Sequence, residues 1–158
     1  MKTLILYTSR HGSTKKVVSQ MAKELSATAI DLHKTPIVSL QEYDTILIGG
    51  PIYLGSLGST LESFMLEHLD MLLSKRIGLF LLCVMNEERA AAQFNHCFHP
   101  QLLAHSSYDG FFGGNVDTKQ LNFIEKIIVF FAFRKKSHQK ELNELEIRNF
   151  LDYFRSTT

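Results

Sequence analysis

Short apolar runs alternate along the chain with segments whose apolar residues recur at helical spacing. The runs typical of buried strands cover residues 3–8, 27–32, 45–48, 77–85 and 108–114. Helical patterns cover residues 15–25, 59–73, 122–133 and 141–154, and the run Ala90-Ala91-Ala92 favours a further helix that Pro100 interrupts. The nearly continuous hydrophobicity of residues 77–85 is typical of a central strand in a parallel sheet that is covered on both faces.

This alternation predicts an α/β fold, a three-layer sandwich in which helices cover both faces of a five-stranded parallel sheet. No internal repeat, linker or low-complexity tract divides the sequence, so residues 1–158 are expected to form one domain. In parallel sheets, ligands bind at the carboxyl ends of the strands, near the point where the strand order reverses. The loops after the first, third and fourth strands therefore form one candidate site.

Composition narrows the function classes. The chain has 158 residues, 45% of them hydrophobic, and its 17 basic and 16 acidic side chains leave a formal charge of +1. Such a balance argues against a nucleic-acid partner, because phosphate contacts usually require a basic excess. Two cysteines make no disulfide framework, and no apolar run reaches the roughly 18 residues of a membrane span. The apolar start is too short for a secretory signal, so a cytoplasmic protein is expected.

The loop after the first strand, Ser9-Arg10-His11-Gly12-Ser13-Thr14, carries the strongest chemical signal. A hydroxyl-rich turn at a helix start offers unpaired backbone N–H groups and the positive end of a helix dipole, which suit a phosphate. Gly12 allows the backbone to approach a ligand closely. The loop is neither a Walker loop nor a GxGxxG fingerprint. A plain strand-to-helix turn with Ser13 or Thr14 as N-cap remains the alternative interpretation.

The loop after the third strand combines backbone freedom with apolar and aromatic surface. It reads Gly49-Gly50-Pro51-Ile52-Tyr53-Leu54-Gly55-Ser56. Such a surface suits a flat heteroaromatic ring, which needs contacts on its faces and backbone hydrogen bonds at its edge. Tyr53 and Leu54 could equally cover the end of the sheet without binding anything.

Together, the two loops resemble those of flavodoxin domains, which bind FMN non-covalently. Residues 8–14 have the form Thr-Ser-Arg-x-Gly-x-Thr, which is similar to the flavodoxin-like, menaquinone-dependent protoporphyrinogen oxidases. In that family a glycine follows the fifth strand and an apolar and basic helix precedes the last helix. Here Gly113-Gly114 and residues 122–136 correspond to these features. The resemblance implies the flavodoxin-like strand order 2-1-3-4-5.

The resemblance also implies a set of FMN-binding residues. The phosphate would be held by Ser9, Arg10, His11, Gly12, Ser13 and Thr14. The flavin ring would be flanked by Pro51, Ile52, Tyr53, Leu54 and Gly55, and closed on its other side by Val84, Met85 and Asn86. In flavodoxins a glycine-containing peptide of the second loop can flip, and the Leu54–Gly55 peptide is the candidate here. No catalytic side chain is predicted, because a flavin supplies the redox chemistry itself.

Two functional classes follow from this resemblance. The first is an FMN-dependent oxidoreductase similar to the quinone-linked protoporphyrinogen oxidases, and the second is a small electron-transfer protein that serves a partner enzyme. The expected partner is therefore a redox protein or a quinone. The near-neutral charge favours the first class over the second. A domain that no longer binds flavin is a third alternative.

Residues 119–137 are predicted to form an apolar-basic helical insertion before the last helix. Its segment 123–136 ends in Arg134-Lys135-Lys136 and could contact a membrane surface or a quinone-bearing partner. The same segment could pack on the sheet or in a dimer seam. A helix that is apolar almost all round has little amphipathic character, which favours packing. The sequence leaves the oligomeric state open.

Metal binding is not expected. The cluster His96-Cys97-Phe98-His99 does not have the ligand spacing of common zinc sites, and its residues are predicted to lie in a polar loop. Cys83 falls within a predicted core strand and is expected to be an inert buried thiol.

Overall fold

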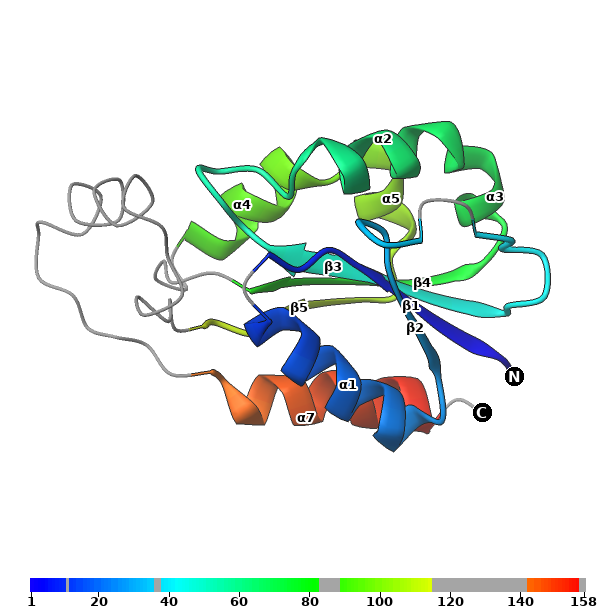
Figure 1. Cartoon of the computed structure of the whole chain (residues 1–158), viewed down its shortest axis with the longest axis horizontal. Helices are drawn as coiled ribbons and strands as arrows, with labels where there is room; N and C mark the ends of the chain where they lie inside the picture. The colour runs from blue at the N-terminus through cyan, green and yellow to red at the C-terminus, as the bar shows by residue number, and fades with distance from the viewer. Residues whose placement is uncertain (11, 36–37, 83–88, 115–141, 157–158) are drawn as a thin grey trace, which may run out of the picture.

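The structure, a computed structural model, describes residues 1–10, 12–35, 38–82, 89–114 and 142–156 (Figure 1). Within these residues the strands are β1 (Thr3–Tyr7), β2 (Thr28–Asp31), β3 (Thr45–Pro51), β4 (Arg76–Leu82) and β5 (Tyr108–Phe111). The helices are α1 (Ser13–Leu25), α2 (Ser59–Glu67), α3 (Leu69–Leu73), α4 (Ala90–Cys97), α5 (Pro100–His105) and α7 (Glu144–Arg155).

The strands form one sheet in the order β2-β1-β3-β4-β5, and each neighbouring pair is parallel. In its centre Leu6 of β1 lies opposite Ile48 of β3, which in turn lies opposite Leu79 of β4. The order reverses at β1, so the loops that follow β1 and β3 leave the sheet side by side. The predicted fold class and strand order are confirmed.

Helices cover both faces of the sheet. Figure 1 shows α1 and α7 on one face and α2, α3, α4 and α5 on the other. Successive strand residues point to opposite faces, so Leu6 joins the core under α2 whereas Ile5 joins the core under α1 and α7. Both residues are fully buried. The continuous apolar runs of the sequence are thus explained by a sheet that is packed on both sides.

Helix α7 docks on the sheet where a glycine makes room for it. A β-carbon added at Gly78 of β4 would clash with the ring of Phe154. At the start of the same strand, the Arg76 guanidinium lies 4.7 Å from the Phe154 ring centroid and 5.1 Å from that of Tyr153. The end of α7 is therefore fixed against the first residues of β4.

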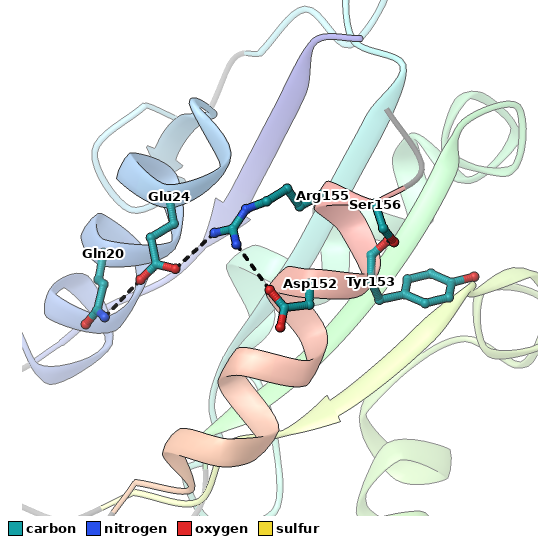
Figure 2. Close-up of polar contacts among 6 residues, drawn as sticks. All are labelled: Gln20, Glu24, Asp152, Tyr153, Arg155 and Ser156. Atoms are coloured by element: carbon teal, nitrogen blue, oxygen red, sulfur yellow. Dashed lines mark hydrogen bonds and ion pairs between the residues drawn. The ribbon is translucent and has the colours of Figure 1, made fainter.

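A polar network joins α7 to α1 on the exposed side of these helices (Figure 2). Arg155 lies 3.2 Å from Glu24 of α1 and 3.1 Å from Asp152 of its own helix. Gln20 donates a hydrogen bond to Glu24 at 3.1 Å. These contacts connect the two helices that cover one face, and α1 is the helix whose start lies at the first loop.

The predicted bounds of β3 and of the helix over 59–73 differ in the structure. β3 continues through Gly49, Gly50 and Pro51 instead of ending before them, because the absent side chain of Gly49 leaves room for Phe80 of β4. The predicted helix over 59–73 is divided into α2 and α3 at His68, which has φ −112° and ψ 15°.

Pro100 does not interrupt a helix but begins α5, where its missing N–H costs nothing. The segment His96-Cys97-Phe98-His99 is not a polar loop either. Cys97 ends α4, and both Cys97 and Phe98 are buried in the core. The prediction failed because the two flanking histidines gave the segment a polar appearance.

Several predictions fall outside the described residues. These are the insertion at 119–137 with its contact segment 123–136, and the end of the fourth strand with Cys83. Within the residues that the structure describes, no helix combines the length and the apolar character that crossing a bilayer requires.

Candidate functional site

The first loop ends in a helix start whose N-cap is a glycine. β1 stops at Tyr7, and the Gly12 N–H donates to Ser9 Oγ at 3.3 Å across the turn that follows. Gly12 has φ +82°, a left-handed conformation that favours glycine, and it is the N-cap of α1. Ser13 and Thr14 are therefore the first two residues inside the helix. The predicted N-cap role of Ser13 or Thr14 is therefore wrong.

The start of α1 presents polar groups to a cavity. No described side chain caps its first turn. The backbone N–H groups there have no partner within the helix, as in any helix start. Thr8 and Thr14 are only 3% and 2% exposed, and neither hydroxyl forms a hydrogen bond with a described residue. Both residues line the cavity. Neither hydroxyl oxygen is one of the fully buried polar atoms that lack a partner, so both can receive a ligand or water from the cavity.

The second loop is a tight turn. Tyr53 and Ser56 exchange two backbone hydrogen bonds of 2.9 and 3.1 Å. Leu54 has φ +51° and Gly55 has φ +83°, the pair of positive values that a type I′ turn requires. Before the turn, the Ile52 N–H donates to the Leu82 carbonyl at 2.9 Å, which ties the loop to β4.

A cavity of about 340 Å³ lies between the two loops. Its wall is formed by Thr8, Arg10, Ser13, Thr14, His33, Pro51, Tyr53, Leu54, Ser56, Leu57, Gly58, Ser59 and Thr60. The Arg10 guanidinium lies 5.2 Å from the Tyr53 ring centroid, so one side chain of the first loop contacts the second loop directly. The volume lies in the range of ordinary small-molecule pockets, roughly 300–1,000 Å³.

The charge of this wall favours an anion. Arg10 contributes a cation, and none of the described residues in the wall is an aspartate or glutamate. His33 is brought to the wall by Asp31, whose carboxylate accepts a hydrogen bond from the His33 N–H at 3.1 Å. The starts of both α1 and α2 also border the cavity, and helix N-termini carry partial positive charge.

A metal site is not indicated by the described residues. No group of three or more His, Cys, Asp or Glu side chains lies close enough together among them to hold an ion.

Comparison with known proteins identifies the family. The sequence model of the flavodoxin domain matches residues 4–143. The chain belongs to the flavodoxin-domain family. A stretch of 73 residues is 33% identical to protoporphyrinogen IX dehydrogenase (quinone) of Escherichia coli strain K12. That match covers 43% of this flavodoxin domain and 40% of the enzyme, so the chain spans less than half of this curated relative.

Solved structures support the same fold at low sequence identity. An archaeal flavodoxin superposes with a TM-score of 0.54 and 13% identity, over 99% of this chain and 95% of that one. An NADH:FMN oxidoreductase gives a TM-score of 0.56 and 13% identity, over 99% and 90%. A WrbA-like flavodoxin from Agrobacterium tumefaciens gives 0.52 and 13%, over 98% and 93%. The architecture of this flavodoxin domain is thus shared with all three.

Of the ten predicted site residues that the structure describes, six line one cavity. Those in its wall are Arg10, Ser13, Thr14, Pro51, Tyr53 and Leu54. Ser9, Gly12 and Gly55 lie in the same loops but outside the wall, and Ile52 packs against the core. His11, Val84, Met85 and Asn86 lie outside the described residues, so their predicted roles stay predictions.

Sequence reasoning missed part of the wall. The missed residues are Thr8, His33, Ser56, Leu57, Gly58, Ser59 and Thr60. A signal existed for two groups of them. Thr8 directly follows the first strand, and residues 56–60 connect the predicted ring-binding loop to the next helix. His33 gave no sequence signal beyond following β2 at the same edge of the sheet.

Proposed function

We propose that this flavodoxin domain binds FMN in the cavity between its first two loops and acts as an FMN-dependent oxidoreductase. One observation carries the proposal. Thr8 and Thr14 are buried residues of the cavity wall whose hydroxyls stay accessible and form no hydrogen bond with a described residue, beside the start of α1. A phosphate would accept hydrogen bonds from these hydroxyls and from the first backbone N–H groups of the helix.

The residues of the cavity fit the two ends of FMN. Arg10 and the start of α1 suit a phosphate, since no described carboxylate in the wall would repel it. Pro51, Tyr53 and Leu54 offer apolar surface for a ring. When bound, FMN would supply the electron-transfer chemistry, while the chain holds and orients it and limits the access of water. Val84, Met85 and Asn86 are proposed to complete the ring site.

The candidate reaction is the quinone-linked oxidation of protoporphyrinogen. Its support is the partial similarity to the Escherichia coli enzyme, together with the Thr-Ser-Arg-x-Gly-x-Thr form of the first loop. Quinone and protoporphyrinogen are proposed as substrates on these two similarities.

The binding part is tested by titrating the FMN-free protein with FMN and with riboflavin, which lacks the phosphate. We expect flavin fluorescence to be quenched by binding and FMN to bind at least about tenfold more tightly than riboflavin. Gly12→Val should weaken FMN binding about tenfold or more, because valine disfavours the φ of +82° that shapes the helix start. Equal affinities for the two flavins would contradict the phosphate assignment.

Ser26→Val is the matched control. Ser26 has φ +50° at the other end of α1 and does not line the cavity. Ser26→Val imposes a similar backbone strain on the same helix. The stability of this variant should therefore fall, while its FMN affinity stays within about twofold of that of the unmodified protein. A comparable loss of FMN affinity in both variants would attribute the Gly12 effect to the helix and not to the site.

The catalytic part is tested with the FMN-loaded protein, protoporphyrinogen and a water-soluble quinone. Turnover without any second protein is the expected result. Flavin reduction that occurs only when a separate reductase is added would overturn the oxidoreductase assignment and indicate an electron carrier.

A further inference from the structure

The turn at 53–56 is supported from outside the cavity by two side chains of different helices. Glu62 belongs to α2 and Cys97 to α4, and neither residue lines the cavity. Each makes a polar contact with one residue of the turn. Both contacts join segments that are separated in the sequence, so the turn is held by the packed fold and not only by its own hydrogen bonds.

Glu62 fixes the end of the turn through Ser56. The Ser56 hydroxyl donates to Glu62 Oε1 at 2.7 Å, and the same hydroxyl oxygen accepts from the Gly58 N–H at 2.8 Å. The Ser56 hydroxyl proton is therefore directed to the Glu62 carboxylate of α2. Glu62 lies in the first turn of that helix, where the helix dipole favours a negative charge.

Cys97 fixes the carbonyl of Gly55. Its thiol donates to this oxygen with an Sγ–O distance of 3.7 Å. The Cys97 side chain is 5% exposed, so water competes little for the contact. A thiol is a weak donor, but it is a directional one that a methyl group cannot replace.

These contacts leave one peptide of the turn open. The Gly55–Ser56 peptide uses both of its polar groups, because the Gly55 carbonyl accepts from Cys97 and the Ser56 N–H donates to the Tyr53 carbonyl. For the Leu54–Gly55 peptide, neither the carbonyl nor the N–H has a hydrogen bond to any described residue. A turn whose neighbouring groups are fixed presents this peptide in one place, which lowers the ordering cost of binding.

We propose that Glu62 and Cys97 are positioning residues, which hold the 53–56 turn so that the Leu54–Gly55 peptide faces the hydrogen-bonding edge of a flavin ring. This inference rests on the proposed function. It attributes part of the affinity for the flavin ring to two residues that lie outside the cavity. Neither residue touches the ligand in this role.

The experiment measures FMN affinity and amide hydrogen exchange in Glu62→Ala and Cys97→Ala. Glu62→Ala should bind FMN about five- to tenfold more weakly, since a hydrogen bond to a carboxylate is lost, and Cys97→Ala about three- to fivefold, since the S–H···O bond is weaker. In the FMN-free protein, the N–H groups of Tyr53 and Ser56 should exchange about five- to tenfold faster, while those of β1 keep their protection. Cys97→Ser and Glu62→Gln retain a donor and an acceptor, so both should restore each value to within about twofold.

Two controls separate positioning from general destabilisation. Glu67→Ala removes an exposed carboxylate from the same helix as Glu62. Leu102→Ala leaves a void in the hydrophobic core where α5 packs, away from the turn. Neither should change the exchange of Tyr53 and Ser56 or the FMN affinity of the folded protein. If Leu102→Ala produces the same losses, or if the conservative variants fail to rescue, the positioning role is overturned.

The failures of the two proposals are distinguishable. If the unmodified protein does not bind FMN, the proposed function is overturned. Amide exchange alone then decides whether Glu62 and Cys97 support the turn. Unchanged exchange and unchanged FMN affinity in both alanine variants overturn the positioning role and leave the proposed function intact.

Discussion

At the scale of single residues, Leu54 carries an evident conformational cost in the second loop. Its φ of +51° lies in the left-handed region, where a β-carbon costs roughly 1–2 kcal/mol. Its side chain is 76% exposed, so burial offsets little of that cost. We expect Leu54→Gly to leave the free energy of unfolding unchanged or to raise it by up to about 1 kcal/mol, as measured by urea denaturation.

Gly55 is the matched comparison within the same turn. It has φ +83°, and no described residue beyond its two chain neighbours has an atom within 4 Å of an added β-carbon, so Gly55→Ala tests the backbone alone. We expect this variant to lose about 1 kcal/mol. A Leu54→Gly variant that is less stable than Gly55→Ala would show that the exposed leucine makes contacts that outweigh its strain.

The sequence predicted the part of the cavity wall that lies within the two candidate loops. Arg10, Ser13 and Thr14 could be found because a hydroxyl-rich, Gly-containing turn at a helix start is itself a recognisable pattern. The mistake about the N-cap arose because Gly12 takes this position through its backbone conformation, which no side-chain preference reveals. His33 could not be found, since only the fold brings the turn after β2 to the cavity.

At the scale of elements, the packing of α7 on β4 depends on Gly78. Its missing side chain leaves the space that the Phe154 ring and Leu47 occupy. We expect Gly78→Ala to destabilise the protein by about 1–3 kcal/mol, because the added methyl group must displace a fully packed neighbourhood. Thermal and urea unfolding would measure the loss.

The cause can be tested with a smaller residue at position 154. In a Phe154→Leu background, the Gly78→Ala substitution should cost at least about 0.5 kcal/mol less than in the original protein, because the two sites are in contact. Additive losses would show that the cost comes from the strand backbone and not from the helix packed on it.

The ion pair between α1 and α7 is expected to contribute little. The Arg155 and Glu24 side chains are 51% and 37% exposed, and such pairs are screened by water and salt. A double-mutant cycle with Arg155→Ala and Glu24→Ala should give a coupling free energy below about 1 kcal/mol that decreases further in high salt. A larger, salt-independent coupling would mean that this network (Figure 2) is a main link between the helices.

Element boundaries were predicted less well than element types, and each error has a local cause. Gly49, Gly50 and Pro51 suggested the end of a strand, yet two glycines were needed inside β3 for close approach to its neighbours. His68 gave no warning of the break between α2 and α3, where its ring stacks on Phe64 with centroids 4.2 Å apart. That stacking belongs to the tertiary structure and has no signature in the helical pattern.

At the scale of the whole molecule, the alternating pattern predicted a parallel sheet covered on both faces, but it did not predict which strands are neighbours. The order 2-1-3-4-5 came from the resemblance of the two loops to those of flavodoxins. Periodicity reports which faces of an element are buried, whereas strand order depends on the direction that each connection takes across the sheet. The site depends on this order, because the reversal at β1 brings the first two loops together.

The two-sided core also gives the protein a specific response to alkaline pH. Tyr7 is 5% exposed in the core under α1. Its burial raises the pKa of its phenol above the usual value of 10.0, and the nearby Asp31 carboxylate raises this pKa further. Above about pH 10, the unfolded chain releases a proton that folded Tyr7 retains, so this contribution to stability is lost as the pH rises from about 10 toward the folded pKa.

We therefore expect Tyr7→Phe to lose less stability than the original protein between about pH 9 and pH 11, by up to about 1.4 kcal/mol for each pH unit above 10. Urea denaturation across this range measures the difference, and the difference at pH 7 supplies the baseline for any change in packing. Burial also raises the pKa of Tyr108, so the Tyr7→Phe variant still loses some stability at alkaline pH. Parallel pH profiles of the two proteins would show that the Tyr7 phenol reaches solvent readily enough to ionise in the folded state.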